Sequence, residues 1–287
     1  MVRMTSRAFR ETAKIGIIGG SGLYELLEDK KHVVLETPFG KTPRIEVGYV
    51  DGVKTAFLPR HAKPGSLKVS HAVPPSEINY RANVYGLRML GIERIYSTNA
   101  VGSINTEISP GQFVIVDQLI DATKRRVGTF YDGKTRIRVN RDKVVSGVVH
   151  VDFTSPYCPE LRGVLINCCK ELGFGHRESG TYVCTEGPRF ETPAEIIAYR
   201  TLGADVVGMT NYPECILARE LSMCYASVAM STNYAAGTGP KKITHEEVKE
   251  IFESNIDKVR TLLKRAIKFT PMERECDCVR ALVGATA

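Results

Sequence analysis

A glycine turn after a short, mostly apolar run is the first feature of the sequence that can bind an anion. Residues 15–18 lead into Gly19–Gly22, where backbone N–H groups can point at a negative ligand and Ser21 can add a hydroxyl. The turn lacks the G-x-G-x-x-G spacing of dinucleotide-binding proteins, and no Gly-Lys-Ser/Thr of a P-loop follows. A plain tight turn explains these residues equally well.

Three further strand-like segments end in residues that can hold an anion. Arg60 and His61 follow 54–59, and both can donate hydrogen bonds to phosphate oxygens. The other two segments end at 98–103 and 208–211, which supply Thr, Asn, Gly and Ser. In an open α/β sheet, ligands sit outside the carboxyl ends of the strands, so we expect one anion site there. Read alone, an Arg-His pair is more often surface.

Alternating strand and helix patterns indicate the elements that position these residues. We expect an α/β fold with a central mixed, twisted sheet and helices on both faces. The expected strands are 14–18, 33–36, 44–49, 54–59, 92–99, 113–118, 180–185, 206–209 and 224–230. The expected helices are 75–90, 158–172, 193–202 and 212–221.

A long last helix is expected from Thr244 onward, because Thr244 and Glu247 have the spacing of a capping box. Its apolar stripe should pack on the sheet and comprises Val248, Ile251, Phe252, Ile256, Val259, Leu262 and Leu263. No linker and no repeat divides the chain. We therefore expect an extension at 1–13, a single domain at 14–270 and a tail at 271–287 that carries a Cys-x-Cys pair.

Composition narrows the classes of function. The net charge of +7 is spread along the chain, which does not favour nucleic-acid binding. The short basic runs 124–126 and 241–242 are read as solvated surface. No segment has the apolar length of a signal peptide or a membrane span, so we expect a cytoplasmic protein with no membrane partner.

Eight cysteines are many for a reduced compartment. The pairs 168–169 and 276–278 lack C-x-x-C spacing and histidine partners, so we expect no metal site and in particular no zinc. The cysteines are either buried small hydrophobes or intracellular disulfides, and the second is favoured for Cys276 and Cys278.

Seven stretches together resemble the methylthioadenosine phosphorylase branch of the trimeric purine nucleoside phosphorylases, over residues 14 to about 268. They are IGGSGL (18–23), PRH (59–61), INYRAN (78–83), NAVGS (99–103), EGPRFET (186–192), GMTNYPE (208–214) and STNYAAG (231–237). The resemblance implies a homo-oligomer built from trimers that binds a purine nucleoside. It also implies inorganic phosphate as co-substrate and no cofactor.

The resemblance also implies roles for single residues. The implied phosphate-binding residues are Ser21, Arg60, His61, Asn99, Ala100 and Thr210. Met209 would lie under the ribose, and Phe190 would line the base pocket with Tyr234 and Ala235 nearby. His150 matches a histidine that reaches the 5′ end of the nucleoside from a neighbouring subunit, and Glu246 belongs to the segment that sets 5′ specificity.

Three positions depart from the adenine-specific pattern. Glu191 follows the pocket Phe190, and Asn233 and Ala235 replace a pair of aspartates. A 6-oxopurine carries a proton on N1 and an acceptor at O6, so Glu191 can accept from N1–H while the Asn233 amide serves O6 and N7. An exposed helix-start acid would also explain Glu191, and a turn residue would explain Asn233.

The sequence therefore predicts phosphorolysis of inosine and guanosine in purine salvage, with Asn233, Glu191 and His61 as catalytic residues. In this mechanism phosphate attacks C1′ as the bond to N9 breaks, without a covalent enzyme intermediate. The alternative substrates are methylthioadenosine and methylthioinosine. A nicotinamide dehydrogenase and a non-catalytic nucleoside-binding protein are more distant rivals. His32, His71 and His176 are assigned to structure or surface. His71 precedes Val73-Pro74-Pro75 as a histidine of the family does, but six extra residues lie between His61 and Pro74.

Overall fold

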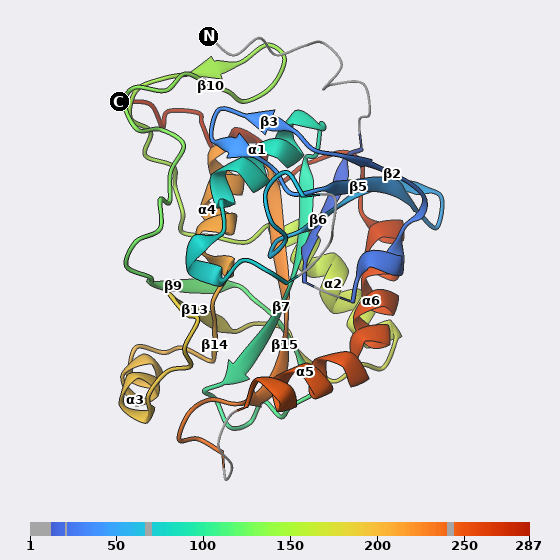
Figure 1. The fold of residues 1–287 in the computed structure, drawn as a ribbon, viewed down its shortest axis with the longest axis vertical. Helices are drawn as coiled ribbons and strands as arrows, with labels where there is room; N and C mark the ends of the chain where they lie inside the picture. The colour runs from blue at the N-terminus through green and yellow to red at the C-terminus, as the bar shows by residue number, and fades with distance from the viewer. Residues whose placement is uncertain (1–12, 21, 67–70, 240–243) are drawn as a thin grey trace.

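A large sheet forms the centre of the computed structural model, which describes residues 13–20, 22–66, 71–239 and 244–287 (Figure 1). The strands of the sheet run in the order β12-β8-β15-β7-β1-β6-β5-β2, and β14, β13 and β9 branch from β7. Pairs at the centre, β6-β1-β7-β15, are parallel, whereas β2-β5, β5-β6, β8-β15 and β7-β14 are antiparallel. The expected mixed sheet is confirmed.

The strands of this sheet are β1 (Ile15–Gly19), β2 (Glu28–Val33), β5 (Ile45–Val50), β6 (Val53–Pro59), β7 (Arg94–Ser103), β8 (Phe113–Ile115), β9 (Gln118–Ala122), β12 (His176–Arg177), β13 (Thr181–Thr185), β14 (Val206–Gly208) and β15 (Cys224–Tyr234). Two small ribbons pair β3 (Glu36–Thr37) with β4 (Gly40–Lys41) and β10 (Ile137–Arg138) with β11 (Val144–Val145). The polar strand β2 was not expected, because EDKKHV has no apolar alternation.

Helices cover both faces of the sheet, as expected. The helices are α1 (Tyr80–Met89), α2 (Pro159–Glu171), α3 (Pro193–Thr201), α4 (Asn211–Glu220), α5 (His245–Ser254) and α6 (Ile256–Phe269), with short 3-10 turns η1 (Tyr24–Leu26), η2 (Pro75–Glu77) and η3 (Asp277–Arg280). Helices α1 and α4 pack together over one face, and α2 and α6 over the other. None of the helices in the described parts of the chain is long and apolar enough to cross a membrane.

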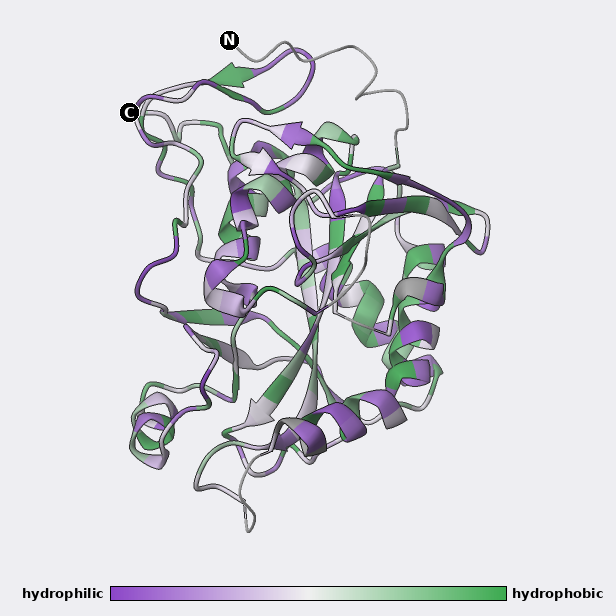
Figure 2. Cartoon of the chain, in the orientation of Figure 1, coloured by the Kyte–Doolittle hydropathy of each residue, from purple (hydrophilic) through white to green (hydrophobic). Residues whose placement is uncertain are grey.

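The prediction of one long last helix is wrong. The helix is interrupted at Asn255, whose φ of −113° and ψ of 5° lie outside the helical region. The amide of Asn255 donates to the Ile251 carbonyl at 2.9 Å and so ends α5. In α6 the stripe residues Val259, Leu262 and Leu263 are buried as expected, and Figure 2 shows polar residues on the outer side of this helix. The side chain of Glu247, and with it the capping box, lies outside the described residues.

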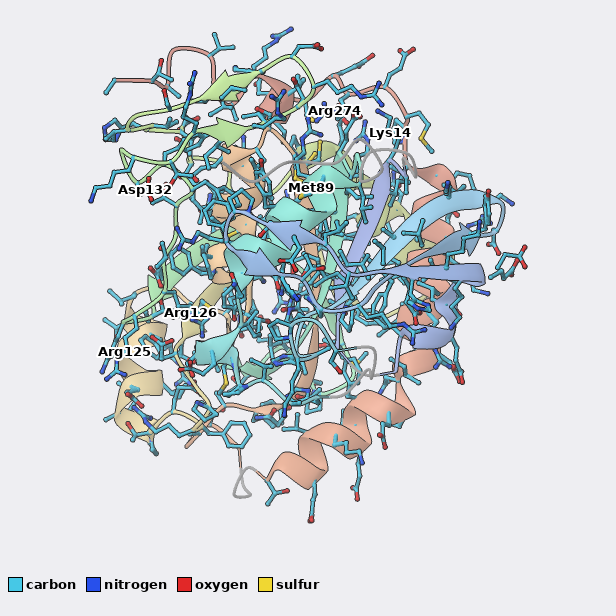
Figure 3. All side chains as sticks on the ribbon, turned by 45° about the horizontal axis from the view of Figure 1, so that its top comes forward. Lys14, Met89, Arg125, Arg126, Asp132 and Arg274 are labelled. Atoms are coloured by element: carbon cyan, nitrogen blue, oxygen red, sulfur yellow. The ribbon has the colours of Figure 1, made fainter. Side chains whose placement is uncertain are left out.

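The tail 271–287 folds back onto the domain. Val149 and Thr286 form an antiparallel bridge, and Leu282 and Ala285 are buried. At the same end of the molecule Glu93 forms ion pairs with both Lys14 and Arg274, which Figure 3 labels. The start and the end of the described domain are therefore fastened to each other.

Candidate active site

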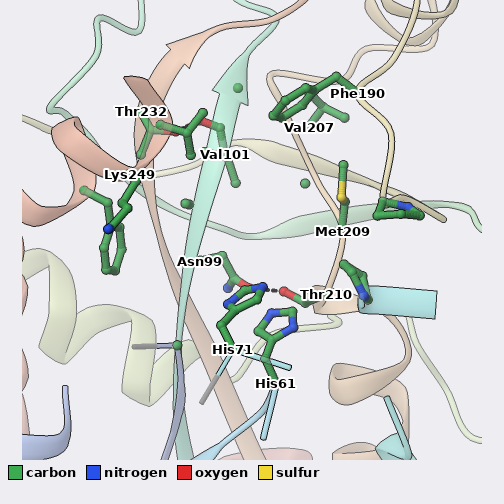
Figure 4. Close-up of a pocket in the computed structure, with 18 of the residues that line it drawn as sticks. His61, His71, Asn99, Val101, Phe190, Val207, Met209, Thr210, Thr232 and Lys249 are labelled. Atoms are coloured by element: carbon green, nitrogen blue, oxygen red, sulfur yellow. Dashed lines mark hydrogen bonds between the residues drawn. The ribbon is translucent and has the colours of Figure 1, made fainter. Parts of the chain in front are cut away.

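A cavity of about 900 Å³ opens where β6, β7, β14 and β15 end, with α5 at its rim. The expected site residues that line it are Arg60, His61, Asn99, Ala100, Phe190, Glu191, Met209, Thr210, Asn233 and Ala235. In Figure 4, Phe190 and Val207 lie at one end of the cavity, His61 and His71 lie at the other, and Met209 lies between them. Segments far apart in the sequence thus meet in one place.

The guanidinium of Arg60 is buried and held in an ion pair with Glu214. Nε donates to Glu214 Oε1 at 2.6 Å and Nη2 to Oε2 at 2.9 Å, while Nη1 donates to the Thr98 carbonyl at 2.8 Å. Burial opposes the charge on Arg60, but Glu214 overcomes this and raises the pKa of Arg60 above its ordinary value. Nη2 also donates to Ser97, which leaves one Nη1 N–H for a ligand oxygen, since a guanidinium has five donors.

Asn99 and Thr210 form a hydrogen-bonded floor beside Arg60. The Thr210 hydroxyl donates to Asn99 Oδ1 at 2.6 Å (Figure 4). Asn99 Nδ2 donates to the Ser227 hydroxyl at 2.7 Å. Ser227 also accepts from Asn211 at 3.1 Å. These bonds fix the rotamer of Asn99 and the position of the Thr210 oxygen, while the neighbouring Ala100 is exposed to the cavity.

The surroundings of His61 favour its neutral imidazole form. Its Nδ1 donates to the Val73 carbonyl at 2.8 Å, and its ring stacks on His71 with centroids 4.0 Å apart. Burial, helped by His71 and Arg60, lowers the pKa of His61 to about 3. Because Nδ1 carries the proton, Nε2 is an acceptor, so this ring can receive a hydrogen bond from a protonated phosphate oxygen.

The opposite end of the cavity has the polar groups expected for a purine base. Glu191 is 9% exposed and accepts from the Thr185 hydroxyl at 2.6 Å. Burial raises the pKa of Glu191. Asn233 accepts from Thr232 at 2.9 Å and donates to the Tyr234 carbonyl at 2.8 Å, so its amide keeps one N–H and one lone pair for a ligand.

The ribose position expected over Met209 is shaped by Gly187. This glycine has a φ of +65°, and a Cβ there would stand 2.6 Å from Met209 Sδ. The glycine lets the segment that carries Phe190 approach Met209 closely. At the rim, α5 contributes Val248 and Phe252, both half-buried, and the exposed side chains of Lys249 and Glu253. Val248 and Phe252 of the predicted stripe therefore line the cavity, and Phe252 also packs against the hydrophobic core as expected.

The prediction that the basic run 124–126 is solvated surface is wrong for Arg126. Its side chain is 1% exposed and lies over the Tyr80 ring. It donates to the carbonyls of Met209 and Tyr212, each at 2.6 Å, and to that of Thr185 at 3.0 Å. Arg126 thus joins the segments that carry the base and ribose residues. A basic triplet by itself gave no signal of this role.

Sequence reasoning also missed His71, Glu214 and Lys249. Glu214 was inside the quoted stretch 208–214, but only the contact with Arg60 shows its role. His71 was assigned to structure or surface, and the structure instead places it in the cavity against His61. Its position before the Val-Pro-Pro segment was the one available signal.

Comparison with known proteins identifies the family. Residues 14–268 match the Phosphorylase superfamily. The chain is 52% identical over 274 residues to the 6-oxopurine nucleoside phosphorylase of Pyrococcus furiosus, covering 95% of this chain and 99% of the relative. It is 45% identical over 275 residues to the S-methyl-5'-thioadenosine phosphorylase of Thermofilum pendens, covering 95% and 98%. This chain belongs to the Phosphorylase superfamily.

A solved member of this superfamily has the same fold. The crystal structure of a methylthioadenosine phosphorylase from an antarctic soil metagenomic library superposes with a TM-score of 0.85 at 37% identity, covering 97% of this chain and 93% of the other. The resemblance expected from the seven stretches is confirmed at the level of the superfamily and the fold.

Among the described residues of this phosphorylase-superfamily chain, three expected site residues do not line the cavity. Ser21 lies outside the described residues. Tyr234, His150 and Glu246 are described but do not line the cavity, and His150 and Glu246 are exposed. Tyr234 alternates with Asn233 along β15, so its side chain leaves the strand on the other side. The expectation that His150 acts on a neighbouring subunit stays a prediction.

Proposed function

We propose that this protein is a 6-oxopurine nucleoside phosphorylase that converts inosine or guanosine and phosphate to free base and ribose 1-phosphate. The observation that carries the proposal is the buried carboxyl of Glu191, which shares the cavity with the Asn233 amide. A carboxylate accepts from the N1–H of a 6-oxopurine and opposes the bare N1 of adenine. The name of the Pyrococcus relative, at 52% identity, supports the same base.

The end of the cavity around Arg60 and His61 supports phosphate as the nucleophile. Arg60 and the backbone at Ala100 offer donors, while the Thr210 hydroxyl oxygen, whose proton is bound to Asn99, and His61 Nε2 are acceptors for a remaining P–OH. Phosphate held there attacks C1′ while the bond to N9 breaks, and the Asn233 amide stabilises the departing base at N7. Positioning and hydrogen bonding supply the catalysis, and we propose that phosphate is the co-substrate and that no further cofactor takes part.

A rate comparison tests this proposal. Inosine, guanosine, methylthioinosine and methylthioadenosine are each supplied with phosphate, and release of base is followed by absorbance. We expect kcat/KM for both 6-oxopurine ribosides to exceed that for methylthioadenosine by a factor on the order of 10³ or more, since unpaired polar groups in a pocket discriminate strongly. Faster cleavage of methylthioadenosine than of inosine would show that Glu191 and Asn233 do not select the base.

A 5′-methylthio substrate is the second candidate, and the rim carries the argument for it. Val248 and Phe252 present apolar surface there, which suits a thioether, whereas Lys249 and Glu253 suit a hydroxyl. The Thermofilum relative has a methylthio nucleoside in its name. The ratio of kcat/KM for inosine to kcat/KM for methylthioinosine measures the preference for the 5′ substituent alone, because the two substrates share one base.

Assembly and location complete the proposal. We propose a homo-oligomer of trimers, because the exposed His150 lies outside its own cavity and would meet a substrate only from a neighbouring subunit. Light scattering after gel filtration gives the mass that tests this. We also propose a cytoplasmic location, which the eight free thiols favour.

A further inference from the structure

Four cysteines from three separate segments meet where β15 begins, at the opposite end of that strand from the cavity. Cys158 precedes α2, Cys224 is the first residue of β15, and Cys276 and Cys278 belong to the tail. All four are buried, and their sulfur atoms lie within 4.8 Å of one another. The Cys276 sulfur stands 3.4 Å from that of Cys224 and 3.6 Å from that of Cys158.

These separations fit four ligands around one metal ion. Zinc binds thiolates at about 2.3 Å, so the sulfur atoms of a tetrahedral site lie roughly 3.8 Å apart. A disulfide would bring one pair to about 2 Å. The 3.4 and 3.6 Å separations from Cys276 to two different segments are near the tetrahedral value, and one sulfur is close to two partners at once.

The surroundings can hold the negative charge of such a site. Zinc with four thiolates carries a net charge of −2, and two largely buried guanidinium groups act on it. Arg94 interacts electrostatically with Cys224 and Cys158, and Arg219 with Cys278. The Nε–H of Arg94 has no acceptor among the described residues. Positive charge at this position offsets the negative charge of a metal–thiolate site.

The tail is held in place for binding by Glu160. Its Oε1 accepts from the backbone N–H of Cys276 at 2.6 Å and of Glu275 at 2.8 Å, and its Oε2 accepts from Arg94 at 2.8 Å. A carboxylate at the start of α2 therefore fixes the Cys-x-Cys segment over Cys158. A site organised in this way needs little rearrangement to bind a metal ion.

We propose that Cys158, Cys224, Cys276 and Cys278 form a structural site that binds one Zn²⁺ through four thiolates. Binding releases the thiol protons to solvent and involves no oxidation. The site joins the tail to α2 and β15. This reverses the expectation of no zinc, which rested on spacing within single segments, because the fold brings ligands together that the sequence separates by up to 120 positions, from 158 to 278.

Metal content and thiol count test the site on the whole protein, purified with a reductant and without chelator. We expect about one zinc per chain by plasma mass spectrometry, and all eight thiols titrating after denaturation in the presence of a chelator. Replacement by Co²⁺ should give thiolate-to-cobalt charge transfer and the intense visible bands of tetrahedral cobalt. Chelation should lower Tm by several degrees, and added Zn²⁺ should restore it.

Matched variants separate this site from ordinary buried thiols. Cys278→Ser should lose the zinc and the cobalt spectrum, whereas Cys169→Ser, a buried cysteine of α2 outside the cluster, should keep both. If Cys278→Ser does not fold, the cobalt spectrum of the unmutated protein still decides. Absence of zinc together with four missing thiols would show two disulfides instead and overturn the proposal, as would a reduced protein that fails to bind Zn²⁺ or Co²⁺.

Discussion

At the scale of single residues, selection of the base depends on how Glu191 and Asn233 are fixed before a ligand arrives. Thr185 holds one oxygen of Glu191, and Thr232 and the Tyr234 carbonyl hold the two ends of the Asn233 amide. Each group therefore offers the base a defined, unshared position. Pre-set donors and acceptors of this kind discriminate best when a mismatch leaves one of them buried and unpaired.

Replacement of Glu191 by Gln should lower kcat/KM for inosine about 10- to 100-fold, because the new amide presents N–H or a weaker acceptor to N1–H and costs ~1–3 kcal/mol. Steady-state assays with inosine and methylthioadenosine measure the effect on each base. Glu107→Gln, an exposed carboxyl paired with Arg177, is the control and should leave both rates unchanged. Equal losses on both bases would show that Glu191 supports the structure of the pocket without reading N1.

The pH dependence should reveal the same carboxyl. Burial raises the pKa of Glu191, and its ionised form accepts from N1–H more strongly than its protonated form. As the pH falls, kcat/KM for inosine should therefore decline at a higher pH than an ordinary carboxyl would cause. The acidic decline should disappear in Glu191→Gln when kcat/KM is measured across the pH range. Its persistence in that variant would assign the decline to another group.

At the scale of elements, the connecting segments matter more for this site than the strands themselves. Residues 185–191 and 209–212 contain the base and ribose positions, and Arg126 ties them together through backbone carbonyls. Because five guanidinium donors in a planar fork reach several carbonyls at once, no lysine can replace this geometry.

Arg126→Lys should lower both stability and turnover. Each buried carbonyl left without a donor costs about 1–3 kcal/mol, so Tm should fall by several degrees and KM for inosine should rise. Calorimetry and steady-state kinetics measure the two effects. Arg125→Lys, at the exposed neighbouring position, should change neither. If KM stays constant while Tm falls, Arg126 stabilises the fold without positioning the ligand.

Periodicity predicted most of the elements, since buried parallel strands such as β1 and amphipathic helices such as α2 have strong local patterns. It missed β2, whose residues are polar and whose existence depends on pairing with β5. It also joined α5 to α6, because the apolar stripe continues across Asn255 although the backbone of Asn255 is not helical. The site was recognised at strand ends, but contacts such as Arg60 with Glu214 require the folded chain.

At the scale of the whole molecule, the buried carboxyl of Glu220 makes the free energy of unfolding depend on pH. Its hydrogen bonds come from a hydroxyl and a backbone N–H, which are both neutral donors. Glu220 accepts from the Thr129 hydroxyl and the Phe130 N–H, each at 2.7 Å. Burial raises the pKa of Glu220 from 4.5 to about 7. The folded state therefore binds the proton more tightly than the unfolded state, and stability should decrease as the pH rises between these two values.

Glu220→Gln should remove this decrease. The shift corresponds to roughly 3 kcal/mol between pH 4.5 and 7, as an upper limit. Urea unfolding at several pH values gives the comparison, and the difference in unfolding free energy between variant and parent should grow with pH across this window. A parallel dependence in both proteins would show that other groups cause it.

The pairing of Arg60 with Glu214 also determines how the cavity attracts its anion. The ion pair has no net charge and His61 is neutral, so the phosphate end recognises its ligand by the direction of hydrogen bonds and exerts little pull at a distance. Dissolved salt screens long-range attraction but has little effect on short contacts. KM for phosphate should therefore change little as ionic strength rises, and a steep salt dependence in initial-rate measurements would reveal attraction from charges elsewhere.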